Sequence, residues 1–256
     1  MLFGRPEFMP EGAGIRPDTP RKKGVARLVE ILSRDLDGIF LSGSLALLAC
    51  APAAAGVGIA IWMGSLPLCL LAACFTGWLV GPALTGLHDT ILRALRDEPG
   101  FWWHTYKRVW KQNFKSSLLP GMFFTMLWAL VGYAAFALPL LADVSPSFAL
   151  ILLLDVVLLL TLGSYYWMQS ALFESSISRK LSNCVRMLLG FLPQTALLTV
   201  FQLGYWLLMA VVIPHCAFVF LLTGLWVPNL LAMLAVYAPI EKSLHLEAKI
   251  SDVQNR

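Results

Sequence analysis

The stretch that decides the fold is GIFLSGSLALLACAPAAAGVGIAIWMGSLPLCLLAACFTGWLVGPALTGL, residues 38–87, which contains no Asp, Glu, Lys or Arg. A helix that crosses a bilayer needs about 20 predominantly apolar residues. The stretch is therefore too long for one span and long enough for two, and the turn signal Gly64-Ser65-Leu66-Pro67 divides it. We predict two transmembrane helices here, over residues 38–62 and 66–87.

The rest of the chain repeats this pattern. Residues 187–240 form a second charge-free run, interrupted at Pro214-His215, and two shorter runs, 116–142 and 144–173, hold a single charge between them. Four further spans are predicted over residues 118–141, 147–172, 188–212 and 216–239. The apolar residues show no period-2 alternation of the kind that outer-membrane barrels need. The predicted fold is an all-α, polytopic membrane bundle of six transmembrane helices.

The basic residues predict an orientation. All 19 Lys and Arg fall in residues 1–37, 88–117, 174–187 and 241–256, and the three other turns carry none. Because basic segments next to spans stay in the cytoplasm, both termini are predicted to be cytoplasmic. The chain then divides into a flexible tail (1–20), an amphipathic surface helix (21–37), a transmembrane domain (38–240) with cytoplasmic segments 88–117 and 174–187, and a cytoplasmic tail (241–256). Topology and contact with the lipid bilayer account for the basic balance, so no nucleic-acid partner is expected.

The stretch FWWHTYKRVWKQNFK, residues 101–115, combines aromatic and basic side chains. At about 100° per residue, its aromatic side chains form one arc of a helix and its basic side chains form the adjoining arc. This pattern is typical of a helix that lies among lipid headgroups, and the alternative is a docking face for a partner. Because Asn113 falls in the aromatic arc, its amide is expected to find a partner such as a backbone carbonyl. The residues expected to contact lipid or a partner are Trp102, Trp103, Tyr106, Lys107, Trp110, Lys111, Asn113, Phe114, Lys115 and Asn183.

Two features within the spans invite a functional interpretation. The first span is rich in Gly, Ala and Ser, which predicts either close packing inside the bundle or a homo-oligomer interface. Asp155 is the one formal charge inside a span. An intramembrane carboxylate is costly unless it is paired or protonated, so Asp155 is either a coupling site for protons or cations or a hydrogen-bonded structural residue. Its expected partners are Tyr133, Gln202, Tyr205 or Asn229.

Catalytic and metal-binding patterns do not occur in the sequence. The four histidines are scattered, and the five cysteines show no paired ligand spacing. There is no Gly-rich phosphate loop and no nucleophile elbow. We expect no enzymatic activity, no metal and no cofactor.

Two motifs resemble a known family. GPALTGL at 81–87, followed by KQNFKSSLLPG at 111–121, is similar to the YesL-like family of bacterial membrane proteins, and ISRKLSNCVRMLLGFLPQTAL at 177–197 looks like its second basic segment. The resemblance marks Gly81, Pro82 and Ala83, the Lys111–Lys115 segment, and Asn183. The chain departs from the pattern in its long N-terminal tail and in its Trp-rich 101–110. Gly81-Pro82 is expected to end a span where the chain turns onto the membrane surface.

The resemblance implies a bacterial cell-membrane protein associated with carbohydrate uptake, and it supplies no catalytic site. The expected function is that of an accessory or scaffold protein that contacts the subunits of a carbohydrate ABC importer. The alternative is a self-sufficient transporter or channel for a small solute that uses Asp155. A polar path of facing side chains would favour the alternative, whereas a dry bundle would favour the accessory role.

Overall fold

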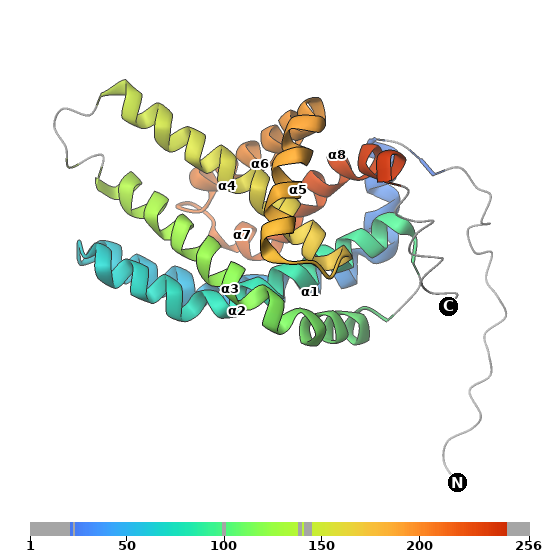
Figure 1. Cartoon of the computed structure of the whole chain (residues 1–256), viewed down its shortest axis with the longest axis horizontal. Helices are drawn as coiled ribbons and strands as arrows, with labels where there is room; N and C mark the ends of the chain where they lie inside the picture. Colours follow the sequence, from blue (N-terminus) through green and yellow to red (C-terminus); the bar gives the residue numbers. More distant parts are fainter. Residues whose placement is uncertain (1–20, 23, 99–100, 138–139, 141–144, 245–256) are drawn as a thin grey trace, which may run out of the picture. The chain divides into compact units, whose positions relative to one another are not determined.

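The computed structural model describes residues 21–22, 24–98, 101–137, 140 and 145–244, and the regular elements in this part of the chain are helical. The predicted tail 1–20 and residues 245–256 lie outside it. The chain divides into two compact units, Met1–Arg34 and Asp35–Arg256. The helices, drawn in Figure 1, are α1 (Val25–Trp62), α2 (Leu66–Arg96), α3 (Trp102–Ala137), α4 (Pro146–Leu172), α5 (Ile177–Gly190), α6 (Leu192–Val212), α7 (Ala217–Thr223) and α8 (Trp226–Leu244).

Several of these helices are long and apolar enough to cross a membrane. Five single helices meet that condition, namely α1, α2, α3, α4 and α6. The pair α7 and α8 meets it as one span with a bend of 45°. The described residues therefore form an all-helical protein with five or six candidate spans, which agrees with the coarse prediction.

The predicted turns between the first two and the last two spans are confirmed. The chain turns at Gly64, which has a φ of 66° that suits glycine, and Ser65 caps α2 by accepting a hydrogen bond from the Leu68 N–H at 3.4 Å. The Pro214-His215 signal lies between α6 and α7, also as predicted. Turn residues thus locate these two breaks correctly from the sequence.

Helices continue through three of the predicted boundaries. Pro82 lies inside α2, which runs on to Arg96, so Gly81-Pro82 does not end the helix. The 101–115 stretch and the span predicted after it form one helix, since α3 continues from it through Pro120, and the position of the stretch at the membrane surface stays a prediction. In the same way α1 runs without a break across the boundary predicted between residues 37 and 38. Each internal proline removes one backbone donor, but neighbouring helices can compensate for that loss in a membrane bundle.

Two predicted spans contain breaks that were not expected. The span predicted over 188–212 begins later, because α5 ends at Gly190 and α6 starts at Leu192. The span predicted over 216–239 is divided between α7 and α8 at Gly224, which has a φ of 45°. Pro228, in the first turn of α8, fits this restart because a proline lacks only a donor that the first turn cannot use.

Helix α2 is the most extensively buried of the spans. It packs mainly against α3, and also against α4 and α8, while α6 packs against α8 and α4 contacts α5. In the first span, the small residues Gly43 and Gly56 lie against Trp226 of α8 and Ala72 of α2. Part of the small-residue content of that span therefore serves packing within the chain, and the homo-oligomer interface stays a prediction.

Candidate functional site

The two family-like motifs pack against each other along the crossing of α2 and α3. Small residues recur every four positions on α2, at Cys69, Ala73, Gly77, Gly81 and Thr85, and a matching row on α3 consists of Ser117, Gly121, Thr125 and Ala129. A Cβ added at Gly81 would overlap the carbonyl oxygen of Ser117, and one added at Gly121 would lie 2.5 Å from the carbonyl oxygen of Gly77. The backbones therefore approach as closely as small residues permit in a membrane bundle.

Polar contacts extend this interface toward one end of the helix pair. The hydroxyl oxygens of Thr85 and Ser117 are 3.1 Å apart, and both side chains are buried. At the next residue of α2, Gly86 makes room for the ring of Tyr106, which a Cβ would approach to 2.6 Å. The contact fixes the start of α3 on α2 and places the residues that follow, Asp89 and Val109, at the same end.

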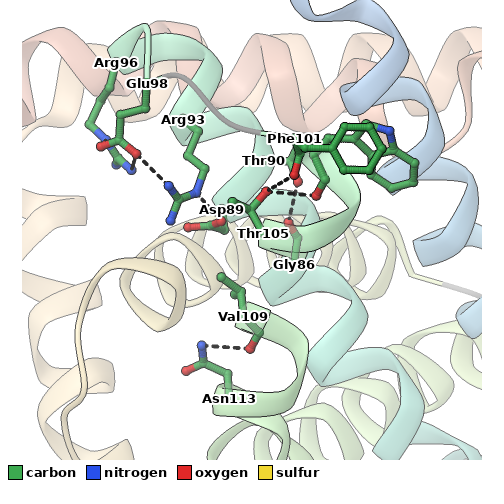
Figure 2. Close-up of polar contacts among 11 residues, drawn as sticks. Gly86, Asp89, Thr90, Arg93, Arg96, Glu98, Phe101, Thr105, Val109 and Asn113 are labelled. Carbon is green, nitrogen blue, oxygen red and sulfur yellow. Dashed lines mark hydrogen bonds and ion pairs between the residues drawn. The ribbon is translucent and has the colours of Figure 1, made fainter. Parts of the chain in front are cut away.

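A charge network caps this end of α2 (Figure 2). Nε of Arg93 donates to Oδ2 of Asp89 at 2.7 Å, and its Nη1 donates to Oε2 of Glu98 at 2.9 Å. Nε of Arg96 donates to the other oxygen of Glu98 at 2.6 Å. The helix ends where Asp97 adopts a left-handed φ of 60°, which folds Glu98 back onto both arginines. Asp89 is 4% exposed and Arg96 is 8% exposed, whereas the side chains of Arg93 and Glu98 are 23% and 18% exposed, so the network is only partly shielded from water.

A polar pocket of about 230 Å³ lies beside this network. Asp89 and Arg93 form its α2 side, and its other walls come from the start of α3 and the end of α4. The full lining is Asp89, Arg93, Arg108, Val109, Gln112, Asn113, Ser170, Ala171, Leu172, Phe173 and Glu174. We take this pocket, which brings the predicted cytoplasmic segments 88–117 and 174–187 together, as the candidate functional site.

A second buried polar cluster adjoins the pocket through Ser170. Its hydroxyl accepts a hydrogen bond of 3.2 Å from Nζ of Lys180, a residue of α5 that is only 2% exposed. Nζ also lies 5.9 Å from the centre of the Tyr166 ring, a cation–π distance. Burial lowers the pKa of Lys180, because desolvation disfavours its charged form.

The amide of Gln169 ties α5 to α4 beside this lysine. Its Nε2 donates to the carbonyl oxygen of Lys180 at 3.3 Å and to Sγ of Cys184 at 3.1 Å. Burial raises the pKa of the Cys184 thiol to about 12, although Gln169 and Lys180 act in the opposite direction. A thiol of this kind is inert, so it contributes to packing rather than to nucleophilic chemistry.

The predicted aromatic arc packs largely against helices of the same chain. Trp102 contacts Gly38 of α1, and the Phe114 ring lies edge-on to the Trp78 ring of α2 with centres 6.1 Å apart. Tyr106 is buried, whereas Trp103 is 44% exposed. The basic arc is exposed at Lys107, Lys111 and Lys115, while Trp110 and Asn183 are half-buried. Lipid or partner contact at these exposed side chains stays a prediction.

The amide of Asn113 has the kind of partner that was predicted. Its Nδ2 donates to the backbone carbonyl of Val109, one turn back on α3, at 3.2 Å (Figure 2). Figure 2 also shows bonds of this local type from the hydroxyls of Thr90 and Thr105 to carbonyls of the preceding turn. Since Asn113 and Val109 both line the pocket, the bond orients a pocket wall.

Asp155 lies apart from the pocket, in the middle of α4, and its side chain is exposed. The expected partners are engaged elsewhere. The hydroxyls of Tyr133 and Tyr205 donate to the carbonyl oxygens of Gly64 and Gly224, and the amides of Gln202 and Asn229 donate to Ser164 and to the Leu225 carbonyl. The structure thus joins none of these four side chains to Asp155.

Of the pocket residues, the sequence points to Gln112 and Asn113, which the family resemblance marks, and it assigns no site role to the others or to Lys180. Asp89 and Arg93 have the i, i+4 spacing that allows an ion pair on one helix, and this is the signal that identifies them. Lys180 has no comparable signal, because the basic residues of segment 174–187 indicate only the side of the membrane on which the segment lies. Its burial depends on how α5 folds back onto α4, which local spacing does not reveal.

The fold, all-helical in the described residues with five or six candidate spans, is compatible with a multi-pass membrane protein. Residues 60–134 match the model of a family of proteins of unknown function, DUF624. The matched segment begins at the end of α1 and covers the α2–α3 pair up to residue 134, including both rows of small residues. No curated protein and no solved structure matches the chain. The similarity therefore concerns the crossing that supports the pocket.

Proposed function

We propose that this chain is a multi-pass protein of the bacterial cytoplasmic membrane that acts as an accessory or scaffold subunit of a carbohydrate ABC importer. The carbohydrate link rests on the resemblance of its motifs to the YesL-like family. The proposed topology has six spans, with α7 and α8 together forming the last one, and with both termini in the cytoplasm. The pocket end of the α2–α3 pair then faces the cytoplasm.

One observation favours the accessory role over transport by the chain alone. Two pairs of buried polar side chains inside the bundle are bonded to each other. Nε2 of Gln202 donates to Oγ of Ser164 at 3.1 Å, and the hydroxyl oxygens of Tyr165 and Thr195 are 2.7 Å apart. A transported solute needs polar groups that it can reach, whereas these groups hold helices together. Asp155, the residue on which the transporter alternative depends, faces outward.

The contact surface of the proposed scaffold is the exposed basic arc of α3 with the outer face of α5. Lys107, Lys111 and Lys115 are exposed on α3, and α5 exposes Leu181, Val185 and Leu189 at helical spacing. A charged arc beside an apolar helix face is a combination that a membrane-associated partner can bind. Apart from Leu189, which follows segment 174–187, these residues belong to the two segments that are predicted to be cytoplasmic.

Affinity capture tests the partner. The tagged full chain is purified in mild detergent from cells grown on several sugars, and co-purifying proteins are identified by mass spectrometry. We expect importer subunits, and we expect the double variant Lys107→Gln with Lys111→Gln to recover less of them. Arg21→Gln with Lys22→Gln removes the same charge elsewhere and serves as the control. Absence of every importer component on all sugars, or equal loss in both double variants, contradicts the proposal.

The topology is tested separately with Cys216, an exposed thiol between α6 and α7. In the proposed orientation this turn faces away from the cytoplasm. A membrane-impermeant maleimide added to intact spheroplasts should therefore label the chain, and Cys216→Ala should remove most of the label. Labelling that appears only after the membrane is permeabilised would reverse the orientation.

A further inference from the structure

The lining of the pocket between α2, α3 and the end of α4 carries charges of both signs. Arg93 and Arg108 contribute positive charge, and Asp89 and Glu174 contribute negative charge. Asp89 uses Oδ2 to accept from Arg93, and Oδ1 has no hydrogen bond within the described part of the chain. Arg108 and Glu174 likewise form no ion pair with any residue that the structure describes. Three charged groups of the pocket therefore have bonding capacity left for a ligand.

The size of the pocket limits what it can hold. Its volume of about 230 Å³ is below the roughly 300–1,000 Å³ of pockets for drug-sized ligands. Polar groups dominate the lining, and Gln112 and Asn113 add amides to the four charged side chains. These features suit a small, strongly polar group that carries both a negative and a positive charge.

The position of the pocket along the helices places it at the level of lipid headgroups. On α2 the charge-free run ends at Leu87, and Asp89 follows about 3 Å further along the axis at 1.5 Å per residue. Gln112 lies about 6 Å before the charge-free run of α3 begins at Ser116, by the same rise. Glu174 directly follows the run of α4. The headgroup zone on each side of a bilayer is about 5–8 Å thick, so the pocket opens within it or at its edge.

We propose that this pocket binds a phosphoethanolamine group. Arg108 binds the phosphate through its planar fork of donors, and Glu174 with Oδ1 of Asp89 binds the primary ammonium. Gln112 and Asn113 supply hydrogen bonds to the linking oxygens. The group can belong to a phosphatidylethanolamine molecule of the inner leaflet or to a free solute, since both present the same atoms.

The charges discriminate against two related headgroups. A phosphatidylglycerol headgroup has no ammonium group, so Glu174 and Asp89 would face its hydroxyls and phosphate without a cation. A phosphocholine headgroup keeps the charge, but its three methyl groups remove the N–H donors that the carboxylates need. Specificity therefore comes from the carboxylate side of the pocket, and affinity for the phosphate comes from Arg108.

Calorimetric titration of the purified full chain in detergent tests the proposal. The probes are dihexanoyl phosphatidylethanolamine, the matching phosphatidylcholine and phosphatidylglycerol, and free phosphoethanolamine. We expect the ethanolamine lipid to bind about tenfold or more tightly than the other two lipids, as charge-assisted hydrogen bonds of about 1.5–3 kcal/mol imply. If free phosphoethanolamine binds as well as the lipid, the ligand is a solute, and if only the lipid binds, the ligand is a membrane component. Both outcomes support the proposal that the pocket binds a phosphoethanolamine group.

Two variants with exposed side chains, and hence little effect on folding, sharpen the test. Arg108→Gln should weaken binding of the ethanolamine lipid about tenfold by loss of a charge-assisted bond. Glu174→Gln should reduce the preference for ethanolamine over choline. Lys242→Gln, which removes an exposed basic side chain of α8 outside the lining, is the control. Equal binding of all three lipids, or variants that bind as the control does, would overturn the proposal. The titration does not depend on capture of importer subunits. The pocket proposal and the importer proposal can therefore fail independently.

Discussion

Asp89 and Asp155 both follow or interrupt long apolar runs, yet the structure treats them in opposite ways. Asp89 is buried at the end of α2, paired with Arg93 and supported by the close α2–α3 crossing. Asp155 is exposed in the middle of α4, and the polar residues of neighbouring helices bond elsewhere. The difference shows that isolation of a charge in the sequence does not identify a site. What identifies one here is the convergence of three helix ends.

The largest effect is expected from breaking the ion pair at Asp89. Asp89→Ala leaves Arg93 with Glu98 as its remaining ion-pair partner. We expect a loss of about 3 kcal/mol, at the low end for buried pairs because Arg93 is partly exposed. Thermal unfolding in detergent, followed by the fluorescence of the nine tryptophans, measures it. Asp155→Ala is the matched control and should change the midpoint little. Equal losses in the two variants would remove the distinction between the aspartates.

The next effect concerns the backbone contact that supports this network. Gly81→Ala places a Cβ against the Ser117 carbonyl in the α2–α3 crossing, which neither backbone can avoid without moving. We expect a loss of about 1–3 kcal/mol, typical of overpacking. Gly163→Ala in α4 is the control, because its Cβ would meet its nearest atoms only at 3.8 Å. If the unfolding midpoint of Gly81→Ala is no lower than that of Gly163→Ala, the close backbone contact at the α2–α3 crossing is contradicted.

The sequence was sufficient for the helical membrane class and for the turns at Gly64 and Pro214, because charge-free runs and turn residues act locally. Prediction from the sequence failed where contacts between distant segments determine the structure. Pro82 reads as a helix end, but α2 continues because α3 and α4 pack around it. The aromatic arc of α3 reads as a lipid-facing surface, but Trp102 and Tyr106 find partners on α1 and α2. The pocket could not be predicted, because its walls come from segments that no spacing rule connects.

A smaller effect is expected on the α5 side of the pocket. Lys180→Met replaces a buried ammonium with an apolar side chain of similar length, and we expect a gain of about 1 kcal/mol at pH 7, the low end for such replacements. The pKa of Lys180 is lowered in the folded state by burial, from a reference value of 10.5. The folded state therefore binds fewer protons than the unfolded state between the two pKa values, and wild-type stability rises with pH in that window.

The advantage of Lys180→Met should consequently shrink as the pH rises toward 10.5. Midpoints of both proteins measured from pH 7 to pH 10.5 test this, and the thiol of Cys184 is present in both, so its own titration cancels in the difference to first order. A constant difference across this range would show that Lys180 titrates normally in the folded protein. Lys180 bonds to Ser170, which lines the pocket with Asp89. The C-terminal end of α4 therefore belongs to the Asp89 region, whereas Asp155 lies on an earlier part of the same helix.

The smallest effect is expected at Asp155 itself. Asp155→Asn removes the charge and keeps the shape, and because the side chain has no partner among the described residues, no buried group is left unsatisfied. We expect a change in stability of about 0.5 kcal/mol or less, as at other surface positions, and unchanged recovery of partners in the capture experiment. A larger loss of stability would mean that a second chain or an ion contacts Asp155 in the membrane. In that case the outer face of α4, rather than the pocket, would be the region where the transporter alternative must be sought.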